Sequence, residues 1–210
     1  RLEDFAAELA DRMLEKDRFD FVAEYADPFP TVIFCKLAGF PAENYEQIMD
    51  WKNTIMHGRD FTGHPRGHAL ACERARALGH DVDPAQPLPR EIAIAVAATA
   101  AQETYGYFQT LLDERRARPK DDLVSKLLAA QYDGERPLTQ EELEDTLFLL
   151  FMAGLDTVAS VLGLIVQAFA TDPQKRKEFI ELMDDPEAIG RAIEELVRIH
   201  AIVLLPRRVT

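Results

Sequence analysis

One run of the sequence, residues 147–170, is almost wholly apolar and yet carries an acid next to an alcohol near its centre, Asp156-Thr157. An apolar run of this length is typical of one long helix. Glycine in a helix interior costs about 1 kcal/mol relative to alanine, and Asp and Thr side chains compete for backbone hydrogen bonds. Gly154, Asp156 and Thr157 therefore predict a helix that carries a function at its centre.

The spacing of small and polar residues favours a binding face on this helix. Leu149, Ala153 and Thr157 follow one another at intervals of four, so they share one face. Ala153 and Gly154 lie one turn before the Thr157 hydroxyl and leave space for a flat molecule close to the backbone. The hydroxyl can also bond back to a carbonyl one turn earlier and open the helix locally. This arrangement suits proton delivery to a small bound molecule. The structural alternative is that the small residues only let another helix pack closely.

A transmembrane span is a second alternative, because about 20 apolar residues suffice to cross a bilayer. Asp156 lies near the centre of the run, where a lone carboxylate costs about 2.5–3.5 kcal/mol on insertion scales. A central helix buried on all sides in a helical protein explains the same composition without that cost. We therefore expect a buried core helix and no membrane span.

Composition places the chain among ordinary globular proteins, since 47% of its 210 residues are hydrophobic and 29% are charged. The formal net charge of -13 argues against nucleic acid as a partner, because phosphate binding needs a basic surface. The two cysteines, Cys35 and Cys72, are too few for a disulfide framework and fit a reducing cytoplasm. The chain opens inside a helical pattern without an initiator methionine, so we expect a piece of a longer protein.

Periodicity and end signals predict a mainly α fold. Helices are expected over residues 2–15, 20–26, 31–38, 42–57, 90–118, 122–131, 139–171 and 186–201. Thr139 and Glu142 have the capping-box spacing and start the central helix. Asp-Pro pairs at 172–173 and 185–186 start the two helices that follow.

The stretch 59–89, rich in Gly, Pro and His, is expected to be a long lid-like connection with at most a short helix at 69–78. His64 and His68 could bind zinc if they lay on one helix. Pro65 and Gly67 disfavour that helix, so we expect loop histidines. The other histidines have no evident ligand partners and are expected in surface or capping roles: His57, His80 and His200.

Glu195 and Arg198 are three residues apart on one face of the last predicted helix, where they can pair. Such a pair in solvent is worth less than about 1 kcal/mol and is common. Its place along the chain is more informative. It follows the Asp156-Thr157 helix after one short helix, and an arginine-bearing segment, Pro206-Arg207-Arg208, comes next.

The ordered set LFMAGLDT at 150–157, AIEELVR at 192–198 and PRR at 206–208 resembles the bacterial cytochromes P450, in particular the soluble camphor-hydroxylase type. The resemblance covers nearly the entire chain. It implies a mainly α, P450-like helical fold in which residues 1–210 form a single partial domain. It also implies that 59–89 is the lid over the substrate entrance.

The resemblance assigns roles to two pairs of residues. Asp156 and Thr157 match the acid-alcohol pair that relays protons during dioxygen activation. Glu195 and Arg198 match a structural pair that supports the haem-ligand loop without reacting.

The resemblance also implies which residues would meet the cofactor and the substrate. Haem-binding positions are Ala153, Gly154 and Arg207, the last as a partner of a propionate. Substrate-facing positions are Leu149, Met152 and Val203. No residue of this chain is expected to ligate a metal. The thiolate loop of that family lies well beyond its ExxR helix, and the two cysteines match no ligand position.

By this resemblance the full-length protein is expected to be a cytoplasmic haem-thiolate monooxygenase containing haem b (iron protoporphyrin IX). It would oxidise a small hydrophobic substrate with O2 and electrons from a ferredoxin-type redox partner. The 210 residues alone are expected to be inactive. The alternative is a non-catalytic helical scaffold or binding module without haem.

Overall fold

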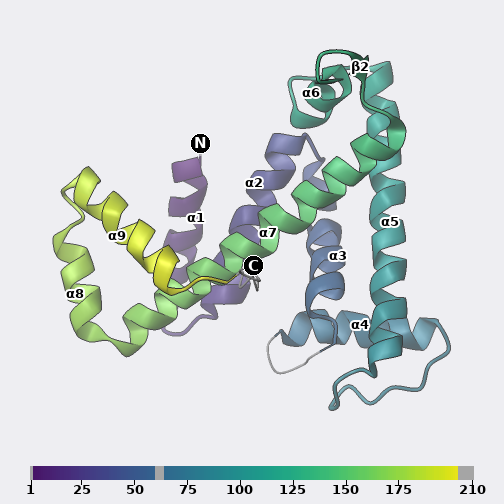
Figure 1. The fold of residues 1–210 in the computed structure, drawn as a ribbon. Helices are drawn as coiled ribbons and strands as arrows, with labels where there is room; N and C mark the ends of the chain where they lie inside the picture. Colours follow the sequence, from purple (N-terminus) through teal and green to yellow (C-terminus); the bar gives the residue numbers. More distant parts are fainter. Residues whose placement is uncertain (1, 60–63, 203–210) are drawn as a thin grey trace, which may run out of the picture. The chain divides into compact units, whose positions relative to one another are not determined.

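The computed structural model describes residues 2–59 and 64–202, and within them the chain is mainly helical, as predicted (Figure 1). The elements are α1 (Leu2–Leu14), η1 (Val22–Ala26), α2 (Pro28–Ala38), η2 (Ala42–Asn44), α3 (Tyr45–His57), α4 (Pro65–Ala77), α5 (Arg90–Ala117), α6 (Leu123–Ala129), β1 (Gln131–Tyr132), β2 (Arg136–Pro137), α7 (Gln140–Thr171), α8 (Pro173–Glu181) and α9 (Pro186–Ile199). The chain divides into two compact units. The first joins the start of the chain, through Phe29, to the part from Thr157 onward, and the second is Pro30–Asp156.

The predicted helix starts of the last three helices are confirmed by their caps. The Thr139 N–H donates to Glu142 Oε2 at 2.8 Å, and the Glu142 N–H donates to Thr139 Oγ1 at 3.2 Å. This reciprocal capping box satisfies two backbone donors that would otherwise lack partners at the start of α7. Asp172 and Asp185 accept backbone N–H groups at the starts of α8 and α9.

Two helices begin at prolines that lie outside the predicted helices. Helix α2 starts at Pro28, three residues before the predicted start. Helix α4 starts at Pro65 and runs for 13 residues, so the expectation that Pro65 and Gly67 prevent a helix is wrong. Proline lacks only an N–H that the first turn leaves without a helical partner, and its fixed φ suits that turn. The predicted long loop 59–89 therefore contains a substantial helix.

The core of the second unit is built around aromatic and aliphatic side chains from α2, α3, α5 and the first half of α7. Helix α3 packs against both α4 and α5. Phe108 and Phe151 are fully buried in this core and meet edge to face, with ring centroids 6.0 Å apart. Burying a side chain of this size contributes about 1.5–3 kcal/mol. The core thus fixes α3 and α7, the two helices that carry the candidate site.

A buried ion pair ties three segments of the second unit together. Arg115 in α5 donates from Nε to Asp122 Oδ2 at 2.6 Å and from Nη2 to the Gly39 carbonyl at 2.5 Å. Asp122 also caps α6 through the Ser125 N–H at 2.8 Å. Gly39 has φ +80°, and a Cβ there would lie 2.2 Å from Asp122 Oδ2. Only glycine meets both the backbone conformation and the close approach.

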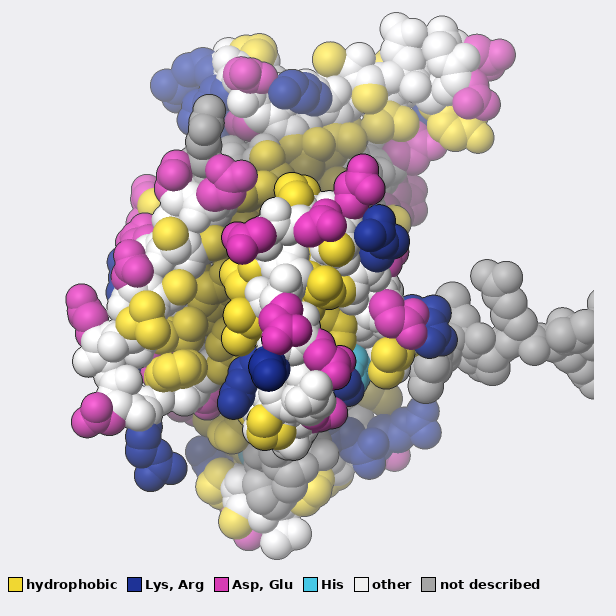
Figure 2. Space-filling model, turned by 90° about the vertical axis from the view of Figure 1, so that its left-hand side faces the viewer, with side chains coloured by type: hydrophobic (Ala, Val, Ile, Leu, Met, Phe, Trp, Pro, Cys, Tyr) yellow, Lys and Arg dark blue, Asp and Glu magenta, His cyan; other side chains and the backbone are white. Residues whose placement is uncertain are grey.

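In the first unit, aromatic rings stack on one another near the start of the chain. Apolar side chains of the same unit are exposed near its end. Tyr25 stacks on both Phe21 and Phe29, with centroids 5.3 and 5.5 Å apart. Figure 2 looks onto the face that carries α8 and α9 and shows hydrophobic side chains between acidic ones. The exposed large hydrophobic residues of this segment are Ile180, Met183, Ile193, Val197 and Ile199.

Helix α7 is long and apolar enough to cross a membrane by length and composition, a test that the core helix of a soluble protein also passes. The expectation that it is buried on all sides is wrong, because only 17% of its most apolar 18-residue segment is buried. Leu147, Phe151 and Leu155 lie one turn apart and are fully buried in the core, whereas Leu149 is 66% exposed. Helical periodicity therefore gives α7 one packed face and one open apolar face.

We expect acid to weaken the start of α7 through Glu142. The bidentate hydrogen bond from Arg136 and then the Thr139 N–H lower the pKa of Glu142 from 4.5 to about 2. Because the folded state lowers this pKa, the stabilisation is complete above about pH 4.5 and is lost as the pH falls toward 2. Glu142→Gln should therefore flatten the loss of thermal stability over this interval, followed by circular dichroism. The neighbouring variant Glu141→Gln is the control, and identical pH profiles for Glu142→Gln and the parent would contradict the assignment.

Candidate functional site

The acid of the predicted acid-alcohol pair lies in a cluster of basic side chains. Asp156 projects from the middle of α7, and its Oδ1 is 2.6 Å from His57 Nε2 at the end of α3. The same oxygen is 3.9 Å from Lys52 Nζ, whose side chain is completely buried. A buried ammonium is costly unless a negative group lies close to it, so Asp156 and Lys52 stabilise each other in the charged state. The structure thus gives the carboxylate an ion-pair partner and a hydrogen-bonded imidazole.

The start of α4 holds the His57 ring from the other side. The rings of His57 and His64 stack with centroids 4.7 Å apart and an interplanar angle of 10°. His64 Nδ1 accepts the Gly67 N–H at 3.0 Å, which caps α4. A Cβ at Gly67 would lie 2.6 Å from the Asn53 carbonyl oxygen and 3.0 Å from His57 Cβ. The absence of a side chain at Gly67 therefore lets α4 begin directly against α3 beside His57.

His68 and Cys72 form a second pair inside α4. His68 Nδ1 lies 2.9 Å from the Gly58 carbonyl, which makes Nδ1 the donor and leaves Nε2 to accept from Cys72 Sγ at 3.4 Å. Burial raises the pKa of the Cys72 thiol, so it stays protonated. No group of three or more metal-binding side chains comes together within residues 2–59 and 64–202. His64 and His68 serve as a helix cap and a packing contact, not as the loop histidines that were expected.

The predicted cofactor and substrate positions on α7 lie on its open face. Ala153 and Gly154 are exposed, Leu149 is 66% exposed, and Met152 is half-buried against the core. A Cβ built at Gly154 would meet a single described neighbour, Phe34 Cδ2, at 3.9 Å. Thr157 is half-buried, one turn beyond Ala153. The described residues thus leave a flat, apolar strip of small side chains, which suits a planar hydrophobic group.

Two predicted positions, Val203 and Arg207, lie outside the described residues. The two cysteines are both buried and free. Burial raises the pKa of Cys35 to about 12. A protonated, buried thiol is a poor metal ligand, because the thiolate is the form that binds metal.

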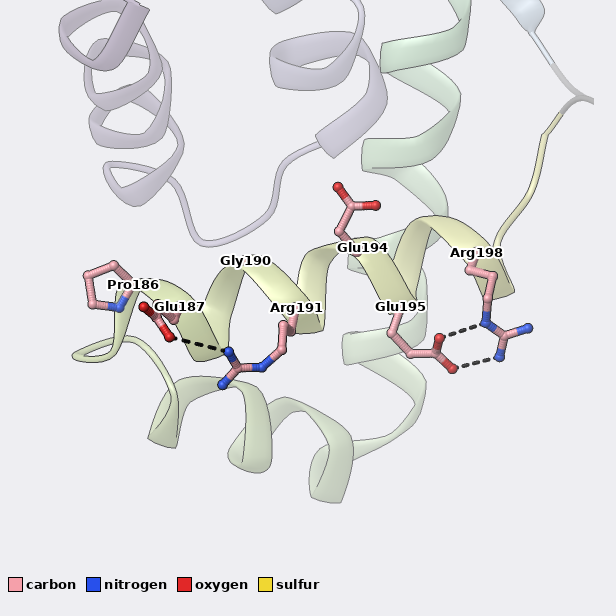
Figure 3. A pocket seen from close by; sticks show the side chains of 7 residues that line it. All are labelled: Pro186, Glu187, Gly190, Arg191, Glu194, Glu195 and Arg198. Atoms are coloured by element: carbon pink, nitrogen blue, oxygen red, sulfur yellow. Dashed lines mark hydrogen bonds and ion pairs between the residues drawn. The ribbon is translucent and has the colours of Figure 1, made fainter.

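The predicted structural pair forms on the surface of α9. Arg198 donates from Nε and Nη2 to the two carboxylate oxygens of Glu195, both at 2.6 Å. Figure 3 shows this pair on one side of the helix, with Glu194 pointing to the other side. The depression beside it is lined by α9 residues alone, so it is an open helix surface. The Arg198 guanidinium lowers the pKa of Glu195, although both side chains are more than half exposed.

Sequence reasoning missed His57 and Lys52 as members of the site. His57 was expected in a surface or capping role, and it lies 99 residues from Asp156 in the sequence. No local spacing links residues so far apart, and a lysine in an amphipathic helix is normally solvated. Only the tertiary structure brings these two basic side chains of α3 to the carboxylate on α7.

Comparison with known proteins gives one consistent result. The family model described as "Cytochrome P450" matches residues 88–210. The protein "Polyketide biosynthesis cytochrome P450 PksS" of Bacillus subtilis (strain 168) is 30% identical over 204 residues, which are 97% of this chain and 42% of that protein. "Mycinamicin IV hydroxylase/epoxidase" of Micromonospora griseorubida is 28% identical over 94% of this chain and 41% of its own length.

Similarity in three dimensions agrees with the similarity in sequence. The solved structure of the Bacillus subtilis 168 PksS protein matches with a TM-score of 0.70 and 29% identity, covering 95% of this chain and 42% of that one. The chain therefore spans about two fifths of the length of these relatives.

Proposed function

Because the chain belongs to the cytochrome P450 family, we propose that the full-length protein is a haem-dependent monooxygenase. It inserts one oxygen atom of O2 into a small hydrophobic substrate and takes its electrons from a ferredoxin-type redox partner. The observation that carries this proposal is Asp156-Thr157 at the centre of α7, beside an open strip of small apolar residues on the same helix. A non-catalytic scaffold is not favoured, because the matching family model is that of the cytochromes P450 and one relative is named a hydroxylase/epoxidase.

The open face of α7 fits the cofactor that the family implies. Haem is a flat, largely apolar group, and Ala153 and Gly154 leave space for it against the helix backbone. When bound, haem b supplies the one-electron and O2 chemistry, which the protein side chains lack. Arg207 would pair with a propionate as a planar cation. We place the thiolate ligand outside these 210 residues, because Cys35 and Cys72 are buried and free.

Asp156 and Thr157 would deliver protons at this face. Thr157 would hold at this face a hydroxyl that can donate a hydrogen bond and accept a proton in exchange. Asp156 carries the carboxylate that resupplies that proton from the side of α3, where His57 contacts it at 2.6 Å. Positioned proton transfer of this kind contributes about 10²–10⁴-fold to rate.

The substrate would lie against an apolar wall. Leu149 and Met152 contribute side chains to it from α7, and Val203 follows α9 in the sequence. Relatives carry names that refer to polyketide biosynthesis and to mycinamicin IV. A hydrophobic molecule of that general kind matches a wall without charged side chains. Glu195 and Arg198 would support the haem-ligand loop without touching substrate.

The proposed location is the cytoplasm. Helix α7 passes the length and composition test for a membrane span, but its buried stripe and Asp156 are explained by packing and by the cofactor face. Under this proposal the open apolar strip is covered by haem and substrate.

Carbon monoxide binding tests the proposed cofactor. The full-length gene product, reduced and treated with CO, should show the red-shifted absorption band of a thiolate-ligated haem. A panel of hydrophobic compounds should then shift the haem spectrum in proportion to binding. Purified full-length protein that carries no haem, or that carries haem without the shifted band, would overturn the assignment.

A further inference from the structure

His57 connects the buried acid of α7 with the solvent. Its Nε2 is 2.6 Å from Asp156 Oδ1, and 28% of its side chain is exposed. Lys52, the other basic neighbour of that oxygen, has a completely buried side chain and lies 3.9 Å away. Of these two neighbours, only His57 can exchange protons with water. An imidazole is also the side chain that gains and releases protons most readily near neutral pH.

We propose that His57 passes protons from solvent to Asp156 and so supplies the acid-alcohol pair, an inference that rests on the proposed function above. In the step, protonated His57 gives up its Nε2 proton: the N–H bond breaks and an O–H bond forms at Asp156 Oδ1. Neutral imidazole and a carboxylic acid result. After Asp156 has passed the proton on toward Thr157, a hydronium ion from the solvent gives a proton to His57: an O–H bond breaks, the Nε2–H bond forms again, and water is left. No electrons move in this step, and charge is conserved.

The surroundings of His57 hold the donor in place for this transfer. Stacking on His64 and the close approach at Gly67 fix the ring between α3 and α4. Among the described residues, charged or titratable groups in contact with the pair include Lys52 from α3 and His64 from the start of α4. The Lys52 Nζ atom lies 3.9 Å from the Asp156 oxygen that would accept the proton. His57 acts through Asp156 and touches neither substrate nor cofactor, so it is a positioning and proton-supplying residue.

Two substitutions separate proton transfer from charge and from hydrogen bonding. His57→Gln keeps a side-chain N–H that can donate to Asp156 but cannot carry a proton. His57→Arg keeps a cation whose protons are not released near neutral pH. In the full-length haem-loaded protein, each variant should slow substrate-dependent O2 consumption by about tenfold or more, given the usual contribution of positioned proton transfer. Each should also raise the solvent deuterium isotope effect, because proton supply then limits turnover.

His80→Gln is the matched control, since His80 is exposed and lies outside this cluster. It should keep the parental rate and isotope effect. The reduced CO spectrum of every variant reports whether the haem site is intact. If only one of the two His57 variants folds, its rate and isotope effect decide the question.

A second readout does not depend on activity. In the reduced CO-bound protein, which is diamagnetic, the His57 Nε2 proton should give a downfield NMR signal, as a proton held in a hydrogen bond to a carboxylate does. The signal should vanish in His57→Gln and exchange faster in Asp156→Asn, which weakens the hydrogen bond. A parental protein without such a signal would exclude the contact on which the proposal depends.

The outcomes distinguish this inference from the proposed function. Absence of the shifted CO band removes the proposed function. A normal band, together with peroxide formation in Thr157→Ala but parental rates and isotope effects in both His57 variants, overturns the inference alone. Slowing in His57→Gln with a parental rate in His57→Arg also overturns it, because a fixed positive charge would then suffice.

Discussion

Replacing Thr157 by alanine in the full-length protein should lower the product formed per electron by about tenfold, the low end of what a positioned proton donor contributes. The electrons should appear as hydrogen peroxide instead. The change removes only the hydroxyl and the γ-methyl of a half-buried side chain, so substrate affinity should stay near the parental value. The measurement compares product, peroxide and consumed reducing equivalents in the same reaction, with substrate affinity taken from the haem spectral shift.

Two further variants make this test specific. Thr157→Ser keeps the hydroxyl and should restore most of the coupling. Thr146→Ala makes the same change earlier in α7, where the hydroxyl bonds back to the Glu142 carbonyl at 2.6 Å, and should leave coupling unchanged. Parental product yield per electron in Thr157→Ala would show that the alcohol takes no part in proton delivery.

The second large effect concerns stability. Asp122→Ala should lower the free energy of unfolding by about 3–5 kcal/mol, because it leaves the guanidinium of Arg115 buried without its carboxylate. The Arg115 side chain is only 2% exposed and that of Asp122 only 5%. Burial alone would raise the pKa of Asp122, but the Arg115 and Ser125 hydrogen bonds outweigh it and lower the pKa. Urea denaturation of the full-length protein, followed by circular dichroism and tryptophan fluorescence, gives the difference.

The neighbouring residue provides the control. Asp121 pairs with Lys126 in solvent, with 93% of its side chain exposed. Asp121→Ala should therefore change stability by no more than about 0.5 kcal/mol. Asp122→Asn keeps an acceptor for the Ser125 N–H and should fall between the two. A loss below about 1 kcal/mol in Asp122→Ala would contradict the role of the buried pair, on the scale known for such pairs.

Local signals predicted the helices well, and their failures have a common cause. The capping box at Thr139 and the Asp-Pro caps are formed by residues within three positions of each other, so the sequence contains the whole interaction. Pro28 was left out of the predicted helix 31–38 and Pro65 was expected to disfavour a helix, because proline breaks helix interiors. Their position in a first turn, where proline is favourable, depends on where the neighbouring segments pack.

The sequence by itself determined the mainly helical fold, the helix starts and the ordered motifs around Asp156-Thr157 and Glu195-Arg198, because these depend on residues close together along the chain. Only the tertiary structure decided that His57 and Lys52 meet Asp156, that Arg115 reaches both Asp122 and Gly39, and that α7 keeps one face open. Contacts between residues tens of positions apart arise from how helices pack against one another. The periodicity of a single sequence shows which face of a helix is apolar, but it does not show what lies against that face.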